Sequence, residues 1–293
     1  AILQGERRTA LVVGNANYAS GASLRNPIND ARAMARALER LGFDVLLHEN
    51  TTQRDMQRAI IAFGRGLAAG GVGLFYYAGH GIQARGRNFL IPVDAKIETE
   101  NEIRLEALDV DSVLDQMVLA DNRINMLVLD ACRNNPFERR FRGESSRGLV
   151  QTDAPKGVLI AYATAPGKVA ADGTGDHGVY TAEIVKAINE RGVKVEDVFK
   201  RVRTNVARVT RDQQIPWEAS SLTGDFYFNP ERAAPMAPPT ASRPASDRED
   251  DRLFWNSIRE SQDPSDFQAY LEAFPNGVFM PLARNRIRAI QTR

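Results

Sequence analysis

The sequence predicts an α/β fold, an α/β/α sandwich with a mostly parallel sheet, followed by a small helical module. Two patterns in its 293 residues indicate this. From Thr9 to about Phe228, short apolar runs alternate with segments of helical periodicity, as in sheets whose parallel strands are joined by helices. After residue 230 the chain becomes rich in Pro, Ala and Ser, and only helical patterns follow.

Five strands are expected in the first part of the chain. The run TALVVGN (9–15) is apolar, β-branched and uninterrupted, which is typical of a strand buried on both faces. The other four are FDVLLHE (43–49), VGLFYYAG (72–79), INMLVLDA (124–131) and GVLIAYATA (157–165). Right-handed crossovers would place the carboxyl ends of these strands at one edge, where ligands bind in such sheets.

Helical segments separate the expected strands. In the segment 26–42, Asn26 is placed to cap the helix, Pro27 suits its first position and Gly42 ends it. Further helices are expected at 51–67, 179–192 and 195–210. Apolar side chains at helical spacing in the segment 51–67 define a face that would cover the sheet.

The chain divides into three parts. Residues 1–229 would form the sandwich domain, and 230–250 a semi-rigid linker, because this stretch combines Pro, Ala and Ser without an apolar period. Residues 251–293 contain three short helical patterns, at 253–261, 263–274 and 280–290. So small a module can build only a small core, and we therefore expect it to bind a protein partner.

Composition and charge exclude several classes of protein. Lysine and arginine number 38 against 37 acidic residues, and the net charge of +1 provides no field for nucleic acid or an anionic membrane. The apolar run around residues 72–79 is about half the length needed to cross a bilayer. The only cysteine is Cys132, which excludes an intrachain disulfide, and no Cys/His cluster predicts a metal.

The compartment stays open at this stage. The chain begins at Ala1 rather than at methionine, so we expect it to be trimmed. A secretion signal removed from such a chain would leave no trace. Both a cytoplasmic and a periplasmic or secreted location are compatible with one free cysteine.

Two chemically distinctive residues each follow an expected strand. His80 lies between glycines in YYAGHG (76–81), and Cys132 lies in LDACRNNP (129–136). A nucleophilic cysteine needs a nearby base, because an ordinary thiol is only a few per cent thiolate at neutral pH. Histidine can supply that base and later protonate a leaving amine. Alone, the histidine could be structural and the cysteine a buried small hydrophobe, but together they predict a catalytic dyad.

The glycines beside His80 fit the same hypothesis. Gly79 and Gly81 would let a substrate approach closely, since neither carries a side chain. The backbone N–H groups of Gly81 and Cys132 would then form a two-donor oxyanion hole.

The motifs FYYAGHG and LDACRNNP, in this order and on this alternation of strands and helices, resemble those of the caspase-like cysteine peptidases. That family includes caspases, metacaspases and bacterial orthocaspases. The resemblance covers about residues 8–228, and the stretches GNANY, LRNPINDA, FLIPVD and HGVYT look like those of bacterial members. It implies a caspase-like sandwich, a cysteine-type endopeptidase with a His80–Cys132 dyad, and peptide substrates selected mainly by the P1 side chain.

Two acidic residues indicate a basic P1 residue. Asp130 lies two positions before Cys132, where the caspase signature carries Gln, and Asp30 matches an acidic position of the metacaspase P1 pocket. Two carboxylates there would favour Arg or Lys and reject Asp, because an unpaired buried charge is costly. Asp30 also has a plainer interpretation, since an acid in a first helical turn offsets the helix dipole.

A basic P1 preference would make the loop after Cys132 a target of the enzyme itself. We expect possible self-cleavage in the segment 137–150, although for any single arginine there an ordinary solvated loop is the plainer interpretation. The candidate sites are Arg139, Arg140, Arg142 and Arg147.

No cofactor is expected from the sequence. Many metacaspases bind calcium through aspartates that follow the catalytic histidine, but here that stretch, IQARGRNFLIPVD (82–94), has Arg87 near one such position. Asp109 and Asp111 alone do not make a convincing calcium site. Two alternatives to a peptidase stay open: a catalytically silent caspase-fold scaffold, and an acyl-transferring relative that shares the acyl-enzyme.

Overall fold

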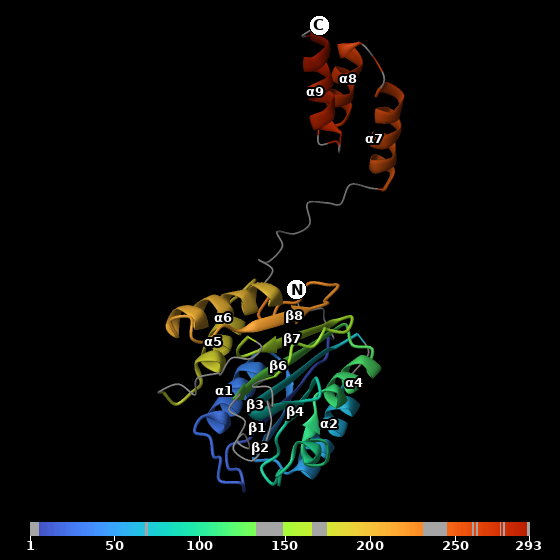
Figure 1. Ribbon diagram of the computed structural model, residues 1–293. Helices are drawn as coiled ribbons and strands as arrows, with labels where there is room; N and C mark the ends of the chain where they lie inside the picture. The colour runs from blue at the N-terminus through green and yellow to red at the C-terminus, as the bar shows by residue number, and fades with distance from the viewer. Residues whose placement is uncertain are drawn as a thin grey trace. The chain divides into compact units, whose positions relative to one another are not determined.

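The computed structural model describes residues 6–67, 70–132, 149–165, 175–230, 245–259, 261, 263–275, 277 and 279–291. The chain separates into two compact units, Ala1–Arg232 and Ala233–Arg293. We call them the sandwich unit and the helical unit (Figure 1). The Pro-rich stretch expected as a linker lies around their boundary.

The sandwich unit is built on a sheet of strand order β2-β1-β3-β6-β7-β8. These strands are β1 (Arg8–Gly14), β2 (Asp44–Glu49), β3 (Val72–Ala84), β6 (Ile124–Cys132), β7 (Val158–Tyr162) and β8 (Trp217–Ser220). All neighbours are parallel except β8, which is antiparallel to β7. The predicted mostly parallel sheet is thus confirmed, and its central strands are β3 and β6.

A short ribbon extends from β3 beside the main sheet. Strand β4 (Arg87–Leu90) turns back along the end of β3, and β5 (Leu108–Asp109) pairs with β4. The turn η1 (Glu100–Glu102) and the short helix α3 (Ile103–Glu106) lie between them in sequence.

Helices cover both faces of the sheet (Figure 1). One face carries α1 (Pro27–Arg40), α5 (Val179–Ile188) and α6 (Val195–Val209), and the other carries α2 (Gln53–Gly66) and α4 (Asp111–Leu119). Two separate buried cores result, because alternate strand residues point to opposite faces. Tyr76 belongs to the core under α1, α5 and α6, whereas Tyr77 belongs to the core under α2 and α4.

The chain's local signals explain where the first helices begin. Pro27 opens α1 as predicted, but the Asn26 side chain is buried and makes no capping hydrogen bond. Helix α2, by contrast, has an ordinary N-cap: the Thr52 hydroxyl accepts the Asp55 N–H at 3.2 Å. None of the helices within the described ranges is long and apolar enough to span a membrane.

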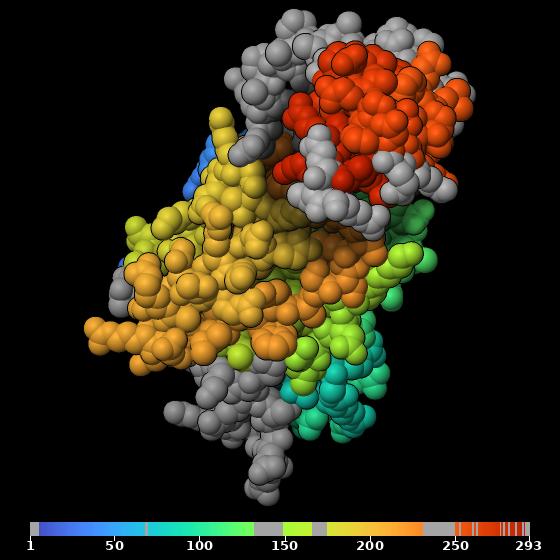
Figure 2. Space-filling model, turned by 90° about the horizontal axis from the view of Figure 1, so that it is seen from above, coloured from blue at the N-terminus to red at the C-terminus, as the bar shows by residue number. Residues whose placement is uncertain are grey.

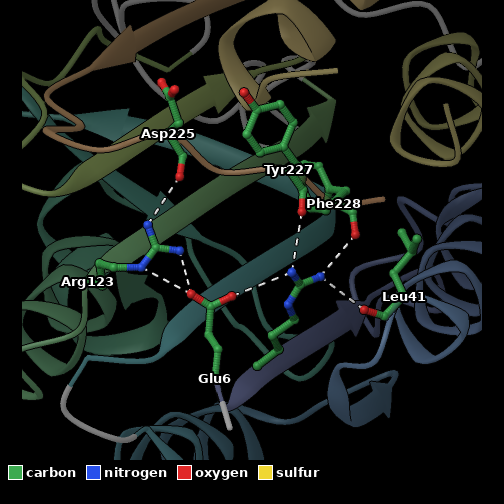
Figure 3. Close-up of polar contacts among 7 residues, drawn as sticks. Glu6, Leu41, Arg123, Asp225, Tyr227 and Phe228 are labelled. Atoms are coloured by element: carbon green, nitrogen blue, oxygen red, sulfur yellow. Dashed lines mark hydrogen bonds and ion pairs between the residues drawn. The ribbon is translucent and has the colours of Figure 1, made fainter. Parts of the chain in front are cut away.

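A buried arginine fastens the beginning of β1 to the end of the sandwich unit (Figure 3). The Arg8 guanidinium donates to the carbonyl oxygens of Phe228 at 3.0 Å, Leu41 at 3.1 Å and Tyr227 at 3.3 Å. The Glu6 carboxylate pairs with Arg8 and also with Arg123. We call this group the Arg8 clamp. It lies at the amino end of β1, whereas the carboxyl end of β1, at Gly14, pairs with Ala78 of β3, two residues before His80.

The helical unit consists of α7 (Ala245–Ile258), α8 (Pro264–Ala273) and α9 (Met280–Gln291). Its described atoms, orange to red in Figure 2, pack around an aromatic core that includes Trp255, Phe267 and Tyr270. The Asp263 side chain caps α8 by accepting the Ser265 N–H at 2.9 Å. Helix α7 begins at Ala245, inside the stretch expected to be linker, so the helical pattern extends further towards the N-terminus than its apolar residues indicated.

Candidate functional site

The two candidate catalytic residues lie opposite each other on neighbouring strands. Strands β3 and β6 run in parallel along nine residue pairs, of which the last is His80 with Cys132. Hydrogen-bonded strands are about 4.8 Å apart, so the two backbones are adjacent at the carboxyl edge of the sheet. The side chain of Cys132 and residues 133–148, including Arg139, Arg140, Arg142 and Arg147, lie outside the described residues.

His80 is buried and closely held. Only 3% of it is exposed, and its Nε2 lies 2.7 Å from the carbonyl oxygen of Ala22. Its ring packs on the ring of Tyr18, with centroids 4.6 Å apart, and its backbone N–H donates to the Tyr18 hydroxyl at 2.8 Å. A carbonyl oxygen can only accept, so in the neutral imidazole the proton resides on Nε2 and Nδ1 is the basic nitrogen.

Tyr77, which belongs to the core under α2 and α4, holds the backbone of His80. Its hydroxyl donates to the carbonyl oxygens of His80 at 2.8 Å and Ile91 at 3.0 Å, and lies 3.4 Å from the hydroxyl of Tyr18. Burial raises the pKa of Tyr77 well above its ordinary value, so the phenol stays protonated and remains a donor.

Gly79 serves packing rather than substrate approach. A Cβ atom there would lie 2.6 Å from the hydroxyl oxygens of both Tyr18 and Tyr77, closer than any real Cβ contact. Its φ of 156° is also uncommon for other residues. The expectation that Gly79 opens space for a substrate is therefore replaced by a steric one: two tyrosines occupy that space.

Gly81 lies where β3 leaves β6 and begins to pair with β4, opposite Leu90. The carbonyl of His80 accepts the Ile91 N–H at 3.0 Å. Bonded and non-bonded pairs alternate in an antiparallel ladder, so Gly81 and Leu90 form a pair of the non-bonded kind. The Gly81 N–H is then directed away from β4, and a Cβ on this residue would lie 3.0 Å from that of Ala131 in β6.

The two candidate P1-recognition acids converge on one glycine. Asp30, in the first turn of α1, is 3% exposed, and Asp130, near the end of β6, is half-buried. Gly178, which precedes α5, lies between them: its Cβ position is 3.1 Å from Asp30 Oδ2 and 3.6 Å from Asp130 Oδ2. The structure thus brings together two carboxylates that are 100 positions apart in sequence.

Each carboxylate is held by the start of α5. Asp30 accepts the Gly178 N–H at 3.0 and 3.2 Å, and its Oδ1 lies 3.1 Å from Nδ1 of His177. Asp130 Oδ2 accepts the Thr181 hydroxyl at 2.5 Å. Neither His177 nor Thr181 is a candidate site residue from the sequence, although both lie in the stretch HGVYT, which resembles that of bacterial family members.

The stretch considered for calcium binding contains Arg87, and this arginine pairs with both candidate aspartates. The Arg87 guanidinium lies 2.7 Å from Asp109 Oδ2 and 2.9 Å from Asp111 Oδ2. The described residues contain no group of three or more His, Cys, Asp or Glu side chains arranged to hold a metal. The two aspartates therefore do not fit a calcium site, because an arginine already occupies the space between them.

Comparison with known proteins adds independent information. The caspase domain family model matches residues 7–227. The human mucosa-associated lymphoid tissue lymphoma translocation protein 1 is 31% identical over 163 residues, which cover 55% of this chain and 19% of that protein. A probable protease of a Desulfuromonadales bacterium is 29% identical over 160 residues, 49% of this chain and 17% of that protein. The chain therefore spans less than about a fifth of each.

A solved structure shares the fold. The crystal structure of the Drosophila initiator caspase Dronc superimposes with a TM-score of 0.56 at 14% identity, over 76% of this chain and 83% of that one. At so low an identity the likeness concerns the arrangement of the sheet and its helices.

Proposed function

The chain belongs to the caspase domain family, and we propose that it is a cysteine endopeptidase whose His80 and Cys132 form the catalytic dyad. The register of β3 and β6, with His80 opposite Cys132, is the observation that carries this proposal. His80 lies within β3 and Cys132 ends β6, both at the carboxyl edge of the main sheet, where α/β sheets bind their ligands. The likeness to a probable bacterial protease supports the same chemistry.

His80 acts first as base and then as acid in the proposed reaction. Its Nδ1 takes the thiol proton of Cys132, and the sulfur attacks the carbonyl carbon of the scissile peptide bond. The same nitrogen then protonates the leaving amine, the C–N bond breaks and an acyl-enzyme remains. Water, losing a proton to His80, hydrolyses the thioester and restores the thiol. The carbonyl of Ala22 supports this cycle because it keeps the Nε2 proton in place.

The oxyanion of each tetrahedral intermediate would lie between the N–H groups of Gly81 and Cys132. The direction of the Gly81 N–H, away from β4 and on the side of β6, supports this assignment. Preorganised donors of this kind contribute a large part of the rate enhancement in acyl transfer.

A basic P1 residue, Arg or Lys, is the substrate preference that best fits the acids. Asp30 and Asp130 flank the same glycine beside the strand end that carries Cys132. Their combined negative charge would pair with a guanidinium or ammonium group and disfavour a P1 aspartate. The same preference makes the segment 137–150 a proposed self-cleavage site, and the helical unit a proposed binding site for a protein partner.

The decisive experiment uses fluorogenic peptides that end in Arg, Lys or Asp at P1. We expect wild-type protein to cleave the Arg and Lys peptides, and Cys132→Ala to lose this activity while keeping its melting temperature. Cleavage after Asp alone would retain the dyad and refute the assignment of Asp30 and Asp130. No cleavage, together with no labelling of Cys132 by an arginyl electrophile, would favour a silent scaffold. Product analysis with an added amine distinguishes hydrolysis from acyl transfer.

A further inference from the structure

The start of α5 contacts both acids of the proposed P1 site. His177 and Gly178 hold Asp30, and Thr181, one helical turn later, holds Asp130. One short segment, 177–181, therefore fixes two carboxylates that come from different parts of the chain. We call this segment the α5 bracket.

The hydrogen bonds on Asp130 have a definite direction. A carboxylate only accepts, so the Thr181 hydroxyl donates to Asp130 Oδ2 at 2.5 Å. Having given its one proton, the Thr181 oxygen accepts from the Tyr76 hydroxyl, also at 2.5 Å. Burial, then the charges of Asp130 and Asp30, raise the pKa of Tyr76 well above its ordinary value. Tyr76 thus stays protonated, and the chain runs Tyr76 to Thr181 to Asp130.

The Asp30 side of the bracket relies on backbone. The Gly178 N–H lies at the start of α5, where backbone donors have no acceptor within the helix, and it donates to Asp30 instead. The helix dipole also favours an anion at this position. The 3.1 Å between the Gly178 Cβ position and Asp30 Oδ2 is a tight contact, so a larger residue at position 178 would push against this carboxylate. Asp30 is therefore held in part by a backbone donor, which no side-chain substitution removes.

We propose, building on the proposed peptidase function, that the α5 bracket determines P1 specificity and that Thr181 is the positioning residue of Asp130. A carboxylate already oriented by Thr181 can pair with a P1 guanidinium without reorienting. Its affinity for a basic group is therefore higher than that of a carboxylate that Thr181 does not hold. Thr181 acts through Asp130 and does not touch the reacting atoms.

The test compares Thr181→Val, which keeps the shape and removes the donor, with Thr181→Ser, which keeps the donor. In the full chain carrying Cys132→Ala, benzamidine is the guanidinium-like probe, titrated by calorimetry. We expect Thr181→Val to weaken benzamidine binding about tenfold, since hydrogen bonds to charged groups are among the stronger ones, and Thr181→Ser to stay within about twofold. Thr204→Val, the same change on the exposed side of α6, is the matched control and should change nothing.

Kinetics provide a second measurement that a merely structural role would not reproduce. With Cys132 intact, Thr181→Val should raise KM for Arg-ended peptides about tenfold with little change in kcat, and Thr181→Ser should restore it. If Thr181→Val does not fold, Tyr76→Phe replaces it, with an expected effect of about threefold in the same direction. Equal benzamidine affinity and equal KM in Thr181→Val and Thr204→Val would overturn the proposal.

The two proposals can fail separately. Benzamidine binding that depends on Thr181, in a protein that cleaves no peptide, would keep the bracket and refute the peptidase. Peptide cleavage by a protein that binds no benzamidine would keep the peptidase and refute the bracket.

Discussion

The guanidinium of Arg8 donates a 3.0 Å hydrogen bond to the carbonyl oxygen of Phe228, so the first strand of the sandwich unit is bonded to its last segment (Figure 3). Arg8 is only 5% exposed and lies 4.9 Å from the ring centre of Phe226. Its charge is therefore compensated by Glu6, carbonyl oxygens and an aromatic face instead of by water.

Replacing Arg8 should destabilise the fold without changing the chemistry. Arg8→Met leaves three carbonyl oxygens without this donor, and we expect the free energy of unfolding to fall by about 3 kcal/mol. Arg32→Met is the matched control: Arg32 forms an exposed pair with Glu49 that solvent screens, so its loss should lower the free energy of unfolding far less. Urea denaturation measures both. The kcat of the folded fraction should not change in Arg8→Met. Equal losses of stability in the two variants would contradict the inferred role of the clamp.

The hydroxyl of Tyr18 should matter for turnover more than for binding. Tyr18→Phe keeps the ring contact with His80 and removes the hydroxyl that accepts the backbone N–H of His80. We expect kcat to fall about tenfold, because a small displacement of a catalytic base is costly, while KM for Arg-ended peptides stays within about twofold. A rise in KM with unchanged kcat would mean that Tyr18 shapes the substrate site instead.

Gly79→Ala should be strongly destabilising. Its new Cβ would meet two tyrosine hydroxyls that are both held by hydrogen bonds, so we expect a loss of more than about 2 kcal/mol and lower activity. Gly66→Ala, at the end of α2, meets only an ordinary contact with Thr9 and should be neutral or stabilise by up to about 1 kcal/mol. Thermal melts would separate the two, and a neutral Gly79→Ala would contradict the steric account of that glycine.

Calcium should not be required. Because Arg87 already bridges Asp109 and Asp111, neither millimolar calcium nor a chelator should change the rate or melting temperature of the wild type. Arg87→Gln removes the cation that lies between the two carboxylates and should lower the melting temperature by a few degrees, with partial recovery on adding calcium. Loss of wild-type activity in a chelator, restored by calcium, would place a metal site elsewhere.

The helical unit should fold on its own. Residues 245–293 contain a buried aromatic core, and the Tyr270 hydroxyl donates to the buried Asp251 carboxylate at 2.5 Å. We expect circular dichroism of this fragment to show a cooperative helical melt, and Tyr270→Phe to lower its midpoint, since a buried charge loses a donor. If the fragment does not melt cooperatively, the helical unit does not fold on its own and this prediction is wrong.

The apolar runs of β3 and β6 could be recognised in the sequence, and they bring His80 and Cys132 to neighbouring strands. Both residues lie within those strands, however, and not after them, because pairing with β4 extends β3 to Ala84 and β6 includes Cys132. Strand β8 escaped prediction, since it is a short, half-buried edge strand without a long apolar run. The contacts of His177 and Thr181 also escaped, because their partners lie 147 and 51 residues away and follow no periodicity. Only the packing of α5 on the sheet brings them together. The reason for Gly79, a collision with two tyrosines, is likewise visible only in three dimensions.

The Arg8 clamp has an architectural consequence. It holds the beginning of β1 next to the last described segment of the sandwich unit, through hydrogen bonds from Arg8 to the carbonyl oxygens of Tyr227 and Phe228. A domain whose ends are neighbours can be inserted into a longer polypeptide as a cassette, with little strain on its own sheet.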